Sequence, residues 1–134
     1  MSTRSRIGIQ LADQSILSVY CHQDGYPEFN GVKLVEHFNS HDAAAELIDG
    51  GGISSLWTNK SWGNWRLPTY GPLYYSARGD EYNPPRLNSN LNEYLSEGEE
   101  YAYLFANGKW VCYNTRSWDE NYLQQMEIPV AVTV

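Results

Sequence analysis

Residues 101–113 read YAYLFANGKWVCY and carry the clearest structural signal in the chain. Apolar and aromatic residues lie on both sides of Asn107 and Gly108. An Asn-Gly pair readily adopts the positive φ angles of a tight two-residue turn. The segment therefore predicts a β-hairpin, in which Trp110 is expected in core or cross-strand packing.

A second hairpin is predicted near the N-terminus. Residues 6–11 and 15–21 alternate between apolar and polar side chains, with a short turn between them. Alternation of this kind is typical of half-buried strands. Residues 73–78 predict a further strand, and residues 128–134 predict the last one, with Pro129 near its start indicating an edge position.

Short helices are predicted where apolar residues recur at helical spacing. The first covers residues 31–38, and a second follows a cap at Asn39 or Ser40 and ends before Gly50. Two further helical stretches are predicted at residues 87–95 and 117–126. Residues 53–70 show no sustained period and are interpreted as a long aromatic loop.

These elements predict a single α+β domain over residues 1–134. We expect a mainly antiparallel sheet of about five or six strands, with the short helices packed on one face. A hydrophobic content of 42% is typical of a globular chain with one core. Cys21 and Cys112 have no metal-type spacing and are interpreted as buried free thiols.

Charge and composition exclude some classes of function. A net charge of −7 with nine Lys and Arg residues disfavours binding to duplex nucleic acid. The only dense acidic cluster, at Glu97, Glu99 and Glu100, is interpreted as a solvated face. No apolar run is long enough to span a membrane or form a signal peptide, so a cytoplasmic location is expected.

The segment YCHQDGYP at residues 20–27 gathers reactive side chains close to Glu36 and His37. His22, Asp24 and His37 are the candidates for acid–base catalysis. A zinc site is disfavoured because the predicted cap near residue 39 breaks the helical spacing of the histidines. The sequence therefore predicts neither a metal nor a cofactor.

Aromatic content favours binding over catalysis. The chain has eleven Tyr and five Trp residues but only three Phe, so most aromatic side chains carry a polar tip. Such residues suit grooves and interfaces. The predicted ligand-binding residues are Tyr20, His22, Asp24, Tyr26, Trp57, Trp62, Trp65, Tyr75 and Arg78.

Several motifs together resemble a family of short uncharacterised proteins of tailed bacteriophages and prophages. They are MSTRSxI at the N-terminus, YCHxDGYP, NG at residues 30–31, LxEHF, and EYxYLFxxGKW around the hairpin. The resemblance implies an accessory protein that acts in the cytoplasm of an infected bacterium. It carries no assigned activity, and the chain departs from the family pattern at Ala77.

We therefore expect a phage accessory protein that acts by binding. Its partner is a host or defence protein, or a small nucleotide-like ligand, and a homo-oligomer stays an open alternative. The rival interpretation is a small hydrolase or transferase that uses Cys21, His22, Asp24 and His37, with or without a metal.

Overall fold

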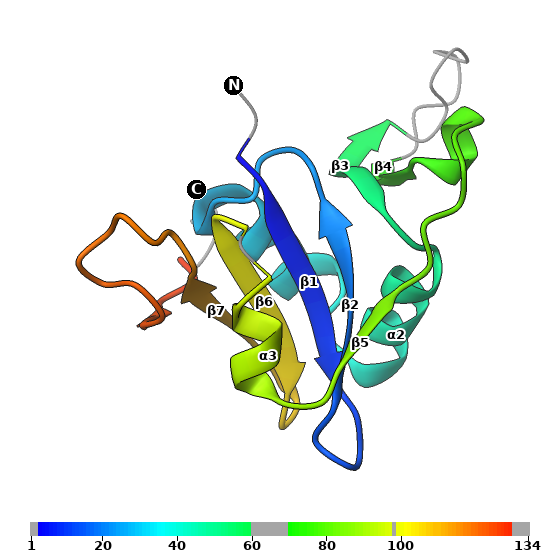
Figure 1. Ribbon diagram of the computed structural model, residues 1–134. Helices are drawn as coiled ribbons and strands as arrows, with labels where there is room; N and C mark the ends of the chain where they lie inside the picture. The colour runs from blue at the N-terminus through cyan, green and yellow to red at the C-terminus, as the bar shows by residue number, and fades with distance from the viewer. Residues whose placement is uncertain (1–2, 60–69, 98, 130–134) are drawn as a thin grey trace.

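The computed structural model describes residues 3–59, 70–97 and 99–129, and these contain one sheet of eight strands (Figure 1). The strands are β1 (Ser5–Gln10), β2 (Ile16–Cys21), β3 (Ile53–Asn59), β4 (Tyr70–Tyr74), β5 (Arg86–Asn88), β6 (Tyr101–Ala106), β7 (Lys109–Asn114) and β8 (Gln125–Met126). The helical segments are η1 (Pro27–Gly31), α1 (Val32–His37), α2 (His41–Asp49), η2 (Ser76–Arg78) and α3 (Leu91–Leu95).

Strand β1 lies at the centre of the sheet. It pairs antiparallel with β2 and parallel with β6, and the full order is β4-β3-β2-β1-β6-β7-β8. Strand β5 pairs with β2 outside this path. Among the described strands five pairings are antiparallel and two are parallel. Both predicted hairpins are confirmed, as β1–β2 and as β6–β7.

The main core lies between α1, α2 and one face of the sheet. Ile7 and Ile9 of β1 point to this face, and Leu47 and Ile48 of α2 pack against them. Strand residues alternate between faces, so β6 contributes its odd-numbered aromatic residues to the same core. Trp110 is also there, with its ring 5.3 Å from that of Phe105, as predicted.

The second face of the sheet carries α3 and a smaller core (Figure 1). Tyr94 of α3 is fully buried there and its hydroxyl donates to the Tyr103 carbonyl at 2.6 Å. Gly8 lies directly below the Tyr94 ring, where a Cβ atom would come within 3.1 Å of Cζ. A side chain at position 8 would therefore push α3 away from the sheet.

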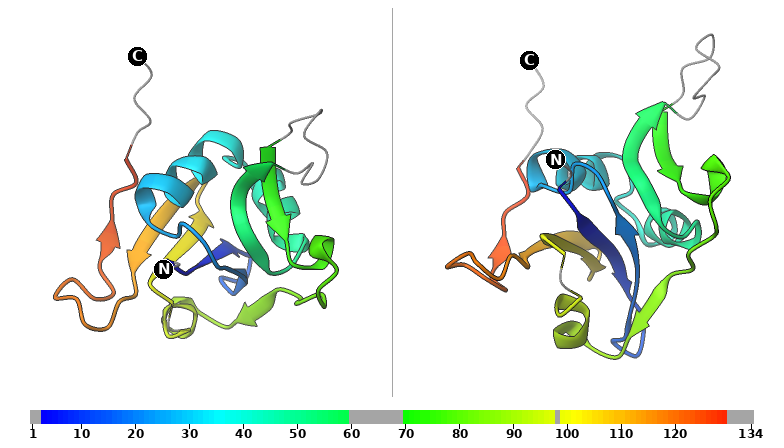
Figure 2. Two further views of the ribbon diagram at one scale, coloured as in Figure 1. Left: turned by 90° about the horizontal axis from the view of Figure 1, so that it is seen from above. Right: turned by 45° about the horizontal axis from the view of Figure 1, so that its top comes forward.

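The predicted α+β class is consistent with this architecture, but two of its details were wrong. The sheet has eight described strands and not five or six, because β3, β5 and β8 were not predicted. Short helices cover both faces and not one, because α3 packs opposite α1 and α2. Figure 2 shows these layers from two further directions.

Local assignments explain the missed strands. Residues 53–59 were predicted as loop but form β3, which pairs with β4 through a ladder with irregular register. The helix predicted at residues 87–95 forms only over 91–95, and Leu87 and Asn88 belong instead to β5. The stretch 117–126 is not helical and ends in β8. The predicted strand at 73–78 is β4 followed by the 3-10 turn η2.

Residues 128 and 129 are irregular, and the rest of the strand predicted at 128–134 lies outside the described residues. No helix in the described part of the chain combines the length and the apolar character needed to cross a bilayer.

The Tyr94 hydroxyl provides a test of how α3 is held. We expect Tyr94→Phe to lower the free energy of unfolding by about 1 kcal/mol, because it removes one buried hydrogen bond without changing the ring. Urea denaturation followed by circular dichroism measures this.

Tyr82→Phe is the matched control. The Tyr82 hydroxyl donates to the Asp49 carbonyl at 3.1 Å but the side chain is exposed, so water replaces the lost bond. Its effect should stay within about 0.5 kcal/mol. Equal losses in the two variants would contradict the anchoring role of Tyr94.

Candidate functional site

A groove opens along the outer edge of β2. Strand β5 covers this edge up to Ser18, which pairs with Arg86, and β3 meets it again only at Cys21, which pairs with Ile53. No described strand pairs with this edge at Val19 and Tyr20. The groove lies at that gap.

The groove has a volume of about 580 Å³. Two tyrosines from different elements line it, Tyr20 of β2 and Tyr75 after β4. The remaining lining residues are Arg6, Val19, Gly52, Asn83, Pro84, Pro85, Arg86 and Glu99. It therefore combines aromatic walls with four groups of strong hydrogen-bonding capacity or charge.

The strand registers bring two arginines to this face. Arg6 of β1 lies opposite Tyr20, and Arg86 of β5 lies opposite Ser18. Tyr20 and Ser18 are two residues apart on β2 and share a face, so both arginines point the same way. Both also line the groove.

Arg6 is buried, with 7% of its surface exposed. Its Nε donates to the Ser18 hydroxyl at 3.0 Å and its Nη2 donates to the Ser18 carbonyl at 3.1 Å. It forms no ion pair with a carboxylate among the described residues. Burial lowers the pKa of Arg6, and the like charge of Arg86 acts in the same direction. Such a cation favours a nearby anion.

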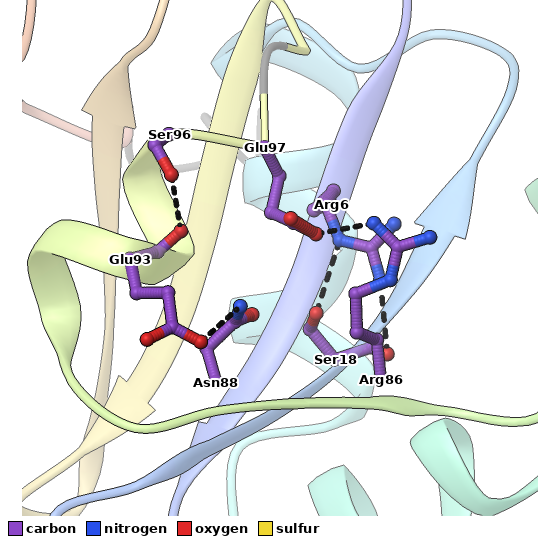
Figure 3. Close-up of polar contacts among 7 residues, drawn as sticks. All are labelled: Arg6, Ser18, Arg86, Asn88, Glu93, Ser96 and Glu97. Atoms are coloured by element: carbon purple, nitrogen blue, oxygen red, sulfur yellow. Dashed lines mark hydrogen bonds and ion pairs between the residues drawn. The ribbon is translucent and has the colours of Figure 1, made fainter.

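Two carboxylates accompany the arginines. Glu97, just after α3, lies 2.5 Å from Arg86 through its Oε2, and Figure 3 shows it reaching toward both arginines. Glu99 lines the groove, and burial raises the pKa of its carboxyl while Arg4 and Arg6 oppose that shift. The groove is therefore an ionic site with balanced charge.

Tyr20 and Tyr75 are the predicted binding residues that this groove brings together. The Tyr20 hydroxyl also lies 2.7 Å from Nδ1 of His22. Burial raises the pKa of Tyr20 to about 12, so its hydroxyl keeps its proton and can donate to that nitrogen. His22 thus orients one wall of the groove.

Asp24 and Tyr26 belong instead to the turn before η1. Asp24 has φ of 56° and accepts a bond from the Tyr26 hydroxyl at 3.3 Å. The next residue has to be glycine, because a Cβ at Gly25 would lie 2.8 Å from the Thr3 carbonyl oxygen. The Gly25 carbonyl accepts a hydrogen bond from the buried Tyr103 hydroxyl. This turn serves the fold.

His37 and Trp57 form a separate aromatic cluster. Their rings stack with centroids 3.9 Å apart and planes 9° apart, and the Tyr70 ring stacks with that of Trp57 at 6.4 Å. No hydrogen bond or ion pair among the described residues joins His37 to His22 or Asp24. The three catalytic candidates therefore have different partners.

The other predicted binding residues cannot be placed in either cluster. Trp62 and Trp65 lie outside the described residues, as does the side chain of Arg78. In the described part of the chain no group of three or more His, Cys, Asp or Glu residues could hold a metal ion.

The two cysteines are free and buried, as predicted. Burial raises the pKa of Cys21 to about 11 and that of Cys112 to about 12. The side chain of Cys21 points to the main core, which is the face opposite the groove. A thiol in this environment stays protonated near neutral pH and is a poor nucleophile.

Sequence reasoning missed the arginines and the glutamates of the groove. Arg6 could have been noticed, because it falls on the polar side of a predicted alternating strand. Arg86 gave no such signal, because it lies just before the helix predicted at 87–95 and the strand β5 that positions it was not predicted. The acidic cluster at 97–100 was interpreted as solvated, yet the Glu97 side chain is only 16% exposed.

Comparison with known proteins gives no relative for this site. The chain matches no family model, no curated protein and no solved structure.

Thiol accessibility tests the burial of the cysteines. We expect the native protein at pH 8 to react with a disulfide reagent at least about 100-fold more slowly than the unfolded protein, since reaction requires opening of the core. Stopped-flow absorbance with and without denaturant measures both rates. A fast-reacting thiol in the native protein would show that one cysteine is accessible.

Proposed function

We propose that the protein acts by binding a small planar anion of the nucleotide type in the groove beside β2. The observation that carries this proposal is that Arg6 and Arg86 line one groove together with Tyr20 and Tyr75. Guanidinium groups match the geometry of phosphate oxygens, and aromatic rings stack on planar heterocycles.

The groove specifies three features of such a ligand. Its anionic group lies against the arginines, and its ring lies against Tyr20 or Tyr75. Glu99 can accept a hydrogen bond from an amino or imino group at the edge of the ring. A purine nucleotide with donors at its base edge has all three features.

The biological setting is part of the proposal and rests on the resemblance to phage proteins. A phage accessory protein in the cytoplasm of an infected bacterium would sequester a nucleotide-like ligand with no catalytic step. Such a role needs no cofactor and no duplex nucleic acid.

A second candidate function is docking of a host or defence protein at the aromatic cluster of His37, Trp57 and Tyr70. Tyr70 is 59% exposed, and exposed aromatic residues are enriched at protein interfaces. Native mass spectrometry would detect self-association of this chain through the same cluster.

The hydrolase alternative has less support. It needs an activated nucleophile next to a base, but the Cys21 thiol is buried with a raised pKa and its partners are the Asn30 amide and the Gln23 carbonyl. No described contact links it to His22 or His37.

The groove proposal is tested by calorimetric titration with GMP, AMP and UMP, and with guanosine and ribose 5-phosphate as partial ligands. We expect at least one purine nucleotide to bind more tightly than either partial ligand. Arg86→Gln should weaken that binding by about tenfold or more, because it removes a charge-assisted contact.

Arg116→Gln is the matched control. It removes the same charge, but Arg116 pairs with Asp119 at 3.0 Å, stacks over Tyr101 and does not line the groove. Its affinity should equal that of the unmodified protein. Absence of binding to all three nucleotides would refute the proposal, and hydrolysis of the recovered nucleotide would refute its non-catalytic part.

A further inference from the structure

The carboxylate of Glu97 lies where the anionic group of a ligand would meet Arg86. Its Oε2 is 2.5 Å from Nη1 of Arg86, and Figure 3 shows it approaching the two guanidinium groups from the end of α3. A carboxylate and a phosphate make the same kind of paired contact with a guanidinium. The Glu97 carboxylate and the anionic group of a ligand would therefore compete for the same position at Arg86.

We propose that Glu97 is a built-in competitor that lowers the affinity of the groove for every anion at this position, and that the two guanidinium groups select a terminal phosphate monoester over a phosphodiester. This inference rests on the proposed function and names the charge that the ligand must carry. When the ligand binds, Arg86 exchanges the Glu97 carboxylate for the anionic group of the ligand.

The charges of the groove explain the selection. Arg6 and Arg86 are balanced by Glu97 and Glu99, so an incoming anion has to replace a carboxylate at Arg86. A phosphodiester carries one negative charge and gains little over the carboxylate that it displaces. A phosphate monoester carries close to two negative charges near pH 8 and interacts with both guanidinium groups more strongly.

The surroundings of Glu97 allow its side chain to leave. Its backbone N–H donates to the Tyr94 carbonyl, and Tyr94 is fixed to the sheet by its own hydroxyl, so the backbone can stay in place. Arg86 has 61% of its side chain exposed, and an ion pair with an exposed partner contributes little to stability. The pair can therefore open, at a modest cost that the incoming anion has to offset.

Glu99 is a weaker competitor than Glu97. It faces Arg4 and Arg6 but forms no ion pair with a described residue, and its carboxyl pKa is raised by burial. It stays available as an acceptor for the ring edge. The competition at Arg86 therefore depends on Glu97.

The test compares Glu97→Gln with Glu93→Gln. Both variants remove one negative charge from the same segment, but Glu93 accepts from the Asn88 amide at 3.3 Å and does not contact an arginine (Figure 3). Glutamine at position 93 keeps an acceptor oxygen for that bond. The control thus separates local competition from overall charge.

The probes are methyl phosphate, a dianion at pH 8, and dimethyl phosphate, a monoanion. Their binding is followed through the Nε–Hε signals of the arginines in nitrogen–proton spectra. We expect the unmodified protein to prefer methyl phosphate by about tenfold, and Glu97→Gln to bind both probes at least about threefold more tightly with this preference retained. Glu93→Gln should behave as the unmodified protein.

Three results would overturn the inference: equal affinities of the two variants for methyl phosphate, no preference between the probes in the unmodified protein, or no binding of either probe. These outcomes are distinguishable from failure of the proposed function. Binding of a purine nucleotide that Arg86→Gln weakens and Glu97→Gln leaves unchanged would keep the groove as a nucleotide site and refute the competition. Binding of methyl phosphate without binding of any nucleotide would refute the nucleotide site and keep the competition by Glu97.

Discussion

The buried guanidinium of Arg6 is the constraint around which the second face of the sheet is arranged. A cation removed from water needs hydrogen-bond acceptors and negative charge close by. Ser18 on the neighbouring strand supplies two acceptors, and Glu97 and Glu99 supply charge at longer range. Because β1 is the central strand, this requirement couples β1, β2 and the segment after α3.

The two faces of the sheet differ in character: one holds the main core and the other carries the groove. The face under α1 and α2 is apolar and holds most of the core, including both thiols. The face under α3 has a smaller core, and next to it lies the ionic groove. Gly8 permits this arrangement because its missing side chain lets Tyr94 lie close to the strand and hold the chain that carries Glu97.

Local patterns in the sequence were sufficient for the hairpins and for α1 and α2. The alternation at residues 15–21 and the turn at Asn107 and Gly108 are local signals, and both led to correct strands. Strand β5 has only three residues and exists through its pairing with β2, so no local pattern could reveal it. Of the site, Tyr20 and Tyr75 were anticipated, whereas the meeting of Arg6 with Arg86 required the register of β5.

The parallel pairing of β1 with β6 has a consequence for how the chain acquires its structure. Ser5 pairs with Tyr101, so the centre of the sheet joins segments from opposite ends of the sequence. Closing so long a loop carries a large entropic cost, and such contacts form late and slow the folding of a domain. The hairpins can form early, but they join into one sheet only when this long-range pairing closes. During synthesis the β1 edge of the N-terminal hairpin therefore stays unpaired until β6, and with it most of the chain, has left the ribosome.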